Sequence, residues 1–511
     1  MSWSVYDTIF DTIAESTQGR KRKKSETCKF CFELVRLSEL PVEEGSHEID
    51  VGTLDHLRAS SCPNHGTILK RFASYSWNSD SDNLYLHKNK AHRAVSLRVG
   101  SSYGQFLVKL PADDGPPSAG QGRILDPHWI RQGLLNEWKD TCQSTHSGNC
   151  DATAARKTSL TGGPNFLVDT SGRCITRAQP TQTYVALSYV WGGCEQLRTV
   201  KGNLESLLQE NSLDNPEWAA KIPQTILDAI RLAGTLDERY LWVDALCIIQ
   251  DDEDEKHSQI NNMAAIYANA SITIVAAQGE DANFGLRGVK GITEPRDFHQ
   301  EIFPLGDQVK FIHSPVVPLS SSTWSKRGWT FQESLLSQRK IIFCGDRVQW
   351  QCPCAVWNED IELDDSITPV HSRGLRQDGF EIMLYGLLNF PWPDLHAYSE
   401  LVSKYSGKGL TYPEDVLSAF SGFTNALAST FKGGFLFGIP EIFFDVGLLW
   451  KGNGALERRT ASHIQGDTEF PSWSWMGWKG SINGLSWNTG LHYIKKATLC
   501  PKFTHLDELP P

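Results

Sequence analysis

The sequence has no apolar stretch that approaches the roughly 20 residues that a membrane-spanning helix needs. Its first residues, MSWSVYDTIFDTIAES, carry acids and lack the basic segment and apolar core of a secretion signal. We therefore expect a protein of the cytoplasm, with the nucleus as the alternative, and no membrane association. The twelve cysteines are then expected to be reduced thiols or metal ligands, not disulfides.

Several motifs of common enzymes are also missing. There is no GxxxxGK[ST] phosphate loop, no GxGxxG after a strand, no HExxH and no GxSxG elbow. These absences remove the simplest assignments to NTPases, dinucleotide-dependent dehydrogenases, zinc proteases and serine hydrolases. Positive charge is in deficit as well, and the net charge of −11 argues against nucleic acid as a general partner.

What is present indicates a globular protein of several domains, with 511 residues, 40% hydrophobic and 21% charged. Composition and periodicity predict four regions. They are a Cys/His-containing N-terminal region at 1–110, a linker and helix at 111–179, an α/β domain at 180–355 and a mainly helical, aromatic-rich region at 356–511.

Strands and helices alternate in the third region, which predicts a parallel sheet in a three-layer α/β core. Residues 280–320 are less regular and are expected to be loops. The predicted strands are 184–190, 240–249 and 271–277, followed by a hairpin at 340–352; the predicted helices start at 222, span 256–269 and span 325–338.

The run YLWVDALCIIQDD, residues 240–252, is the most apolar part of this pattern and is expected to be a strand buried on both faces. Asp244 interrupts it. A buried carboxylate is costly unless it has partners, so Asp244 is either a structural hub or part of a site.

Two paired donors near the N-terminus have the spacing of a tetrahedral zinc site. Cys28 and Cys31 form one CxxC pair, and Cys62 and His65 form a CxxH pair about thirty residues later. They are either ligands of a structural zinc or scattered reduced thiols.

Two further features have a functional and a structural interpretation. Cys142, His146 and Cys150 could bind a metal, but without a fourth donor the set favours a cap on a packed helix pair. The basic run at residues 20–24 is either a nuclear signal or a solvated arm, which is the commoner case.

Trp329 and Glu333 lie four residues apart, on the same face of the helix predicted at 325–338. An indole beside a carboxylate suits a planar ring attached to a sugar, because the carboxylate can hold ribose hydroxyls and stabilise an oxocarbenium-like state. Spacing alone nevertheless favours a core Trp329 and a surface Glu333.

Three blocks resemble the fungal heterokaryon incompatibility (HET) domain. They are YVALSYVWGG from Tyr184, the run from IPQTILDAIRLAG through YLWVDALCIIQDD to MAAIYANASITIVAAQG, and RGWTFQESLLSQR from Arg327. The resemblance covers about residues 180–350. It implies an effector of self/non-self recognition that promotes cell death when genetically different fungal cells fuse, acting as a homo-oligomer or with a partner incompatibility protein.

The HET domain is in turn remotely similar to the Toll/interleukin receptor (TIR) domain, a flavodoxin-like fold with some members that hydrolyse NAD and others that are non-catalytic adaptors. The resemblance implies an NAD glycohydrolase or, alternatively, a self-associating signalling module. For the enzyme it implies Glu333 as the catalytic acid, Trp329 as the residue stacking on nicotinamide, and a lining of Ser188, Tyr189, Trp191, Gly192, Asp244 and Arg327.

Overall fold

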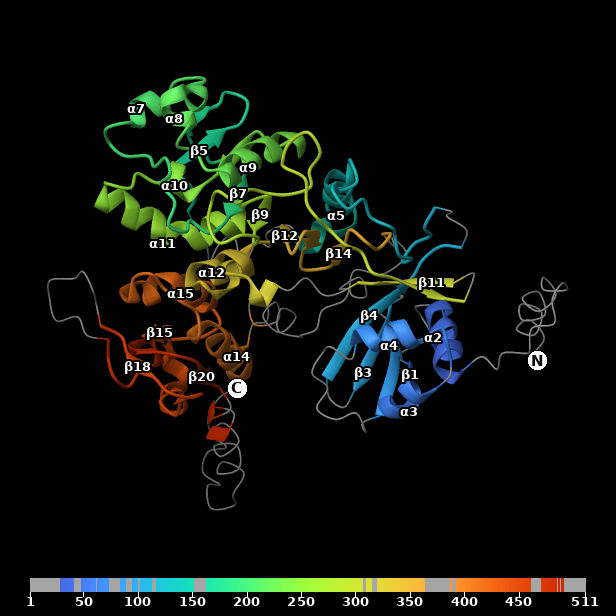
Figure 1. The fold of residues 1–511 in the computed structure, drawn as a ribbon. Coiled ribbons are helices and arrows are strands. Elements are labelled where there is room, and N and C mark those ends of the chain that lie inside the picture. Colours follow the sequence, from blue (N-terminus) through green and yellow to red (C-terminus); the bar gives the residue numbers. More distant parts are fainter. Residues whose placement is uncertain are drawn as a thin grey trace, which may run out of the picture.

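The computed structural model describes residues 28–40, 47–60, 62–72, 83–88, 94–99, 102–112, 116–150, 162–306, 309–314, 319–363, 387, 392–460, 470–484, 486–487 and 489–490. The basic run at 20–24 lies outside the described residues. Within them, no helix has both the length and the apolarity that crossing a bilayer requires. Figure 1 shows three groups of elements: the N-terminal sheet in blue, a central group in green and yellow, and the C-terminal helices in orange.

The N-terminal region forms a six-stranded antiparallel sheet in the order β1-β2-β3-β4-β11-β10. Its last two strands come from residues 302–313, about two hundred positions after β4, so the expectation of loops at 280–320 is wrong for this segment. Figure 1 shows β11 beside β4. The elements are α2 (Lys29–Glu39), β1 (His47–Thr53), α3 (Leu54–Ala59), α4 (Gly66–Phe72), β2 (Asn83–Lys88), β3 (Val95–Val99), β4 (Ser102–Lys109), β10 (Ile302–Leu305) and β11 (Val309–His313).

The central region is built on an eight-stranded mixed sheet in the order β14-β13-β12-β9-β7-β8-β5-β6. Its four middle strands are parallel, whereas the strands on either side of them pair antiparallel, so the expected parallel sheet is confirmed only at the centre. The strands are β5 (Phe166–Asp169), β6 (Cys174–Arg177), β7 (Val185–Ser188), β8 (Tyr240–Trp242), β9 (Ile272–Ala276), β12 (Lys340–Cys344), β13 (Arg347–Gln351) and β14 (Val356–Asn358).

Helices connect these strands much as the periodicity predicts. The inward face of α9 carries Ile226, Ile230 and Ala233, which are all buried. Asp252 caps α11 by accepting a hydrogen bond from the Glu255 amide. In Figure 1, α9 is drawn above β7 and β9, and α11 below them. The helices are α5 (Leu134–Cys150), α7 (Leu204–Leu207), α8 (Pro216–Ala219), α9 (Gln224–Thr235), α10 (Asp244–Cys247), α11 (Glu253–Asn269) and α12 (Gly328–Leu336).

The strand predicted at 240–249 is wrong beyond its third residue. β8 ends at Trp242, and the chain turns into α10, which Asp244 begins. Leu241 and Trp242 are buried in the sheet, and Ala245 to Cys247 are buried in the helical turn. An apolar run cannot distinguish these two conformations, because both bury every side chain. Asp244 therefore stands at the carboxyl end of a strand and not within one.

The order of the parallel strands defines where a ligand can bind. In chain order β7 comes first, β8 second, β9 third and β12 fourth, yet β7 lies between β8 and β9. This second-first-third-fourth order is how flavodoxin-like sheets begin, and such sheets bind ligands beyond the carboxyl ends of the strands on either side of the reversal. That place is the end of β7, at Ser188. The three-layer, TIR-like arrangement itself stays a prediction.

The C-terminal region packs on the central one through α15, which contacts α11 and α12. Gly422 of α15 allows this close approach, because a Cβ there would lie 2.5 Å from both Ala264 and Gln332. The elements are α14 (Leu395–Ser406), α15 (Val416–Leu427), β15 (Phe435–Leu436), β16 (Ile439–Pro440), α16 (Phe444–Gly447), β17 (Lys451–Gly452), β18 (Glu457–Arg458), β19 (Trp478–Lys479) and β20 (Ile482–Asn483).

Candidate active site and metal-ligand clusters

A buried carboxylate lies at the carboxyl end of β7. Glu333 projects from α12 toward this strand and accepts a hydrogen bond from the Ser188 hydroxyl, while the indole Nε1 of Trp324 donates to the same Ser188 oxygen at 2.8 Å. Glu333 is only 6% exposed and Ser188 is fully buried. The interpretation of Glu333 as a surface residue is therefore wrong: helical spacing fixes which residues share a face, but the neighbouring strand decides whether that face is solvated.

Burial changes the acidity of Glu333. Removal from water raises the pKa of Glu333 to about 7, and the nearby Asp244 charge adds to this rise. Arg327 and hydrogen bonds from Ser188 and Tyr267 oppose it without cancelling it. Glu333 is consequently near half-ionised at neutral pH, a state that structural surface carboxylates do not reach and that general acids and bases commonly use.

A second acid lies beside the first. Asp244 accepts a hydrogen bond from the Trp191 indole at 2.7 Å and another from the Ala245 amide at 2.7 Å. Burial raises the pKa of Asp244, while the Trp191 hydrogen bond, the Ala245 amide, Arg327 and Tyr189 lower it. Asp244 is thus a hub for its neighbours and interacts electrostatically with Glu333, and its part in a binding site stays a prediction.

Charged and aromatic residues form a partly exposed rim around this buried floor. Trp191, Asp244 and Arg327 are half-buried, whereas Ser188, Tyr189, Tyr267 and Glu333 are buried. Arg327 donates to the backbone oxygen of Tyr189 at 2.8 Å, which holds the cation at the end of β7.

Two of the predicted site residues have contacts outside this group. Gly192 has a φ of +66°, and a Cβ there would lie 2.2 Å from the Cβ of Asp281, so the glycine permits close packing of two loops. Trp329 donates its indole N–H to Asp415 at 3.3 Å and packs against the cores of both the central and the C-terminal regions. In this conformation Trp329 joins α12 to the C-terminal region.

The sequence did not single out two members of the site. Trp324 holds the Ser188 hydroxyl, and Tyr267 of α11 hydrogen-bonds the Leu187 carbonyl at 3.0 Å as well as interacting with Glu333. No local pattern signals either role, because their partners lie more than 60 positions away along the chain.

The four predicted metal ligands near the N-terminus lie together. Cys28, Cys31, Cys62 and His65 place their donor atoms within 4.8 Å of one another. The Sγ atoms of Cys31 and Cys62 are 3.7 Å apart, and His65 Nδ1 lies 3.1 Å from Cys28 Sγ and 3.9 Å from Cys31 Sγ. The other ring nitrogen of His65 lies 2.9 Å from the Leu57 carbonyl, so it can donate its N–H there while Nδ1 faces the sulfurs.

A second cluster has four buried donors where the sequence suggested three. Cys142, His146 and Cys150 of α5 are joined by Cys352, which follows β13, and all four donor atoms lie within 4.8 Å of one another. The prediction of a helix cap rested on the lack of a fourth donor. That premise is wrong, because the fourth donor comes from about two hundred residues later in the chain.

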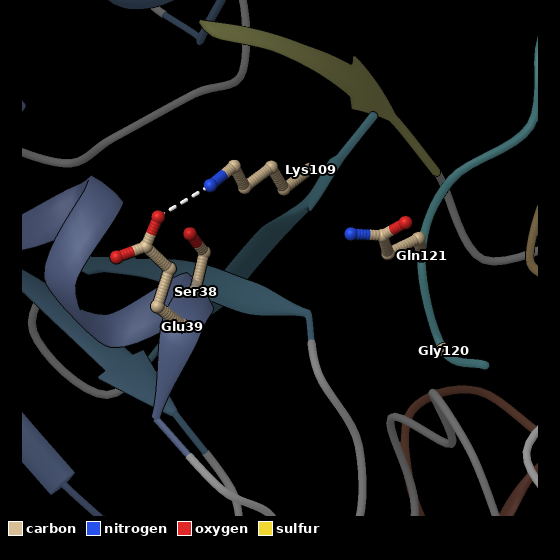
Figure 2. A pocket seen from close by; sticks show the side chains of 5 residues that line it. All are labelled: Ser38, Glu39, Lys109, Gly120 and Gln121. Atoms are coloured by element: carbon tan, nitrogen blue, oxygen red, sulfur yellow. Dashed lines mark hydrogen bonds and ion pairs between the residues drawn. The ribbon is translucent and has the colours of Figure 1, made fainter. Parts of the chain in front are cut away.

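A hollow lies beside the last turn of α2, the helix that carries Cys31 of the first cluster. It is lined by Ser38, Glu39, Lys109, Gly120 and Gln121. Figure 2 shows that Lys109 and Glu39 pair across it, so the charges of this hollow neutralise each other.

Comparison with known proteins gives two matches. Residues 184–333 match the model of the family "Heterokaryon incompatibility protein (HET)". The chain is also 26% identical over 216 residues to "Heterokaryon incompatibility protein 6, OR allele" of Neurospora crassa, covering 34% of this chain and 31% of that protein. The chain therefore spans about a third of the curated relative that it matches. No solved structure matches the chain.

Proposed function

Because residues 184–333 form a heterokaryon incompatibility domain, we propose that the protein acts in fungal heterokaryon incompatibility, and that it does so by cleaving NAD at Glu333. The family match and the Neurospora relative support the first part. The second part depends chiefly on one observation: a buried acid with a pKa of about 7 lies at the reversal point of a parallel sheet.

The proposed reaction is hydrolysis of the bond between the nicotinamide nitrogen and ribose C1′. The bond's electron pair leaves with nicotinamide, and water adds to C1′, which gives ADP-ribose and a proton. Positive charge develops on the ribose as the bond breaks, and the ionised form of Glu333 stabilises it while holding the ribose hydroxyls. Ser188 and Tyr267 fix the carboxylate in place through their hydrogen bonds.

The rim residues would position the rest of the dinucleotide. Arg327 offers positive charge toward the pyrophosphate, and the half-buried Trp191 offers an aromatic face. Trp329 packs against the cores of both the central and the C-terminal regions, so its role in stacking nicotinamide stays a prediction outside this proposal.

Nicotinamide release from NAD by the purified full-length protein tests the catalytic proposal. We expect product from the parent, none above background from Glu333→Gln, and parental activity from Glu253→Gln, whose side chain is 85% exposed on α11. Glu333→Gln keeps the size of the acid and one oxygen that can accept the Ser188 hydrogen bond, so its circular dichroism should match the parent. Absence of product from concentrated parent protein would refute the proposal.

Non-catalytic signalling by self-association is the second candidate, and the burial of Glu333 favours it, since a 6% exposed acid must be uncovered before it can meet a substrate. Expression of the parent and Glu333→Gln in a fungal host separates the two. The enzyme requires that Glu333→Gln spare the cells, whereas an adaptor would kill equally well with either residue.

We further propose that Cys28, Cys31, Cys62 and His65 hold a structural zinc. Zinc bonds of about 2.3 Å to sulfur and 2.0 Å to nitrogen place tetrahedral donors about 3.4 to 3.8 Å apart, close to the distances found here. The bound ion would join α2 to the segment between α3 and α4, where the N-terminal region has a small core of its own.

A further inference from the structure

We propose that Cys142, His146, Cys150 and Cys352 form a second structural zinc site, which fastens α5 to the end of the central sheet. Three donors follow one another at four-residue intervals along α5, and the fourth lies between β13 and β14. The site therefore joins two segments that are far apart in the chain, and the hydrophobic pattern of the sequence does not predict that they meet.

The geometry of the donors fits a tetrahedral ion. Cys352 Sγ lies 3.6 Å from His146 Nδ1, and a zinc with bonds of about 2.3 Å to sulfur and 2.0 Å to nitrogen would set this separation at about 3.6 Å. All four donor atoms lie within 4.8 Å of one another. None of the three cysteines forms a disulfide.

Burial makes an ion-free cluster costly. Cys142 and Cys150 are fully buried, Cys352 is 2% exposed and His146 is 4% exposed. A single cysteine is readily buried in a core. A buried imidazole among three thiols, however, loses its hydrogen bonds to water and has only weak hydrogen-bonding partners in their place. A bound zinc would satisfy the imidazole and all three sulfurs together.

The surrounding charge also suits a bound ion. A zinc with three thiolates and one neutral histidine carries a net charge of −1. The buried guanidinium of Arg339 donates from Nε to the Cys142 sulfur at 3.4 Å, so a positive charge already lies beside the site. Trp357 of β14 covers the histidine, with its ring centre 5.5 Å from the imidazole.

This second site lies close in the chain to the Glu333 helix. Arg339 is three residues beyond the end of α12 and directly precedes β12. Cys352 directly follows β13, the partner of β12 in the hairpin. A bound zinc would thus hold the β12–β13 hairpin, which follows Glu333 in the chain. The proposed site does not depend on NAD cleavage.

Zinc counting by mass spectrometry on the purified full-length protein tests the proposal. We expect two zinc ions per chain in the parent and one in Cys142→Ser. The control Cys344→Ser removes a buried thiol from the same hairpin, away from the cluster, and should keep both ions. Cys31→Ser removes a ligand of the N-terminal site only, and it should also leave one zinc ion per chain.

The outcomes separate the two zinc sites. A single zinc that is lost in Cys142→Ser but kept in Cys31→Ser would support this proposal and refute the N-terminal site. A zinc content that Cys142→Ser leaves unchanged would overturn this proposal. If Cys142→Ser fails to fold, zinc-edge X-ray absorption of the parent decides instead. Two ions per chain with a mean shell of three sulfurs and one nitrogen support the site, one zinc that Cys31→Ser keeps also supports it, and no zinc left in Cys31→Ser contradicts it.

Discussion

Two buried glutamates of the central region, Glu333 and Glu359, have very different surroundings. Glu359 forms an ion pair with Arg296 at 2.5 Å, and both side chains are 1% exposed. Glu333 accepts hydrogen bonds from hydroxyl groups, and among the ion pairs found within the described residues none includes it. Burial raises the pKa of both acids, but only Glu359 has a cation in direct contact.

The network around Glu359 has the features of a structural ion-pair network that links separate segments of the chain. Arg296 also donates to the backbone oxygens of Asp126, Trp129 and Asp346, so one guanidinium joins three segments. A second buried pair, Arg347 with Asp360 at 2.7 Å, lies next to it in sequence. The difference teaches that burial alone does not distinguish a candidate catalytic acid from a structural one, and that Glu333 differs from Glu359 in lacking a cation in direct contact.

The largest expected effect on stability comes from breaking the Glu359 pair. Arg296→Met leaves the buried carboxylate uncompensated and should lower the free energy of unfolding by about 3 to 5 kcal/mol. Urea unfolding of the parent, both single variants and Arg296→Met/Glu359→Gln gives the coupling energy. A loss below about 1 kcal/mol would remove the contrast between the two acids.

Glu333→Gln should raise the free energy of unfolding, whereas Arg296→Met should lower it. The pKa of Glu333 lies near 7 in the folded chain and near its ordinary 4.5 in the unfolded chain. Below pH 4.5 both states hold the proton, and as the pH rises toward 7 only the unfolded state releases it, so stability falls across this window. Replacement by a neutral amide should therefore stabilise the protein at pH 8, by on the order of 3 kcal/mol.

Thermal unfolding of the parent and Glu333→Gln at pH 5 and pH 8 measures this gain. We expect a clearly higher melting temperature for the variant at pH 8 and a much smaller difference at pH 5. A variant less stable than the parent at both pH values would show that Glu333 is a structural residue like Glu359.

Ser188→Ala should have the smallest effect. It removes a hydrogen bond that favours the ionised carboxylate, so the pKa of Glu333 rises further and the pH dependence of NAD cleavage moves upward by about one unit. Activity at pH 7 should then fall about fivefold and largely recover at pH 9. Ser271→Ala, at the other end of the same sheet, is the control, and an equal loss at both pH values would contradict this role.

Local patterns predicted much of the central region. The succession of strand-like and helix-like apolar segments predicted β7, α9, α11 and β9. The β12–β13 hairpin turns at Gly345 and Asp346, which both have positive φ. These features depend on residues close together in the chain.

Contacts between distant segments could not be predicted in the same way. The return of β10 and β11 to β4, the burial of Glu333 against Ser188 and the arrival of Cys352 at His146 each join residues more than one hundred positions apart. Single-sequence periodicity contains no information on such pairings. The remote similarity to TIR domains drew attention to Glu333, a catalytic role that stays a prediction, but only the three-dimensional contacts show why the pKa of that acid is raised.

The pH dependence of nicotinamide release tests the central claim most directly. Initial rates for the parent and Glu333→Gln would be measured between pH 5.5 and 9 at saturating NAD. The account predicts a parental rate that rises through a midpoint near pH 7, as Glu333 loses its proton, and a variant at background throughout. Equal rates for the two proteins, or no release by the parent at any pH, would contradict it.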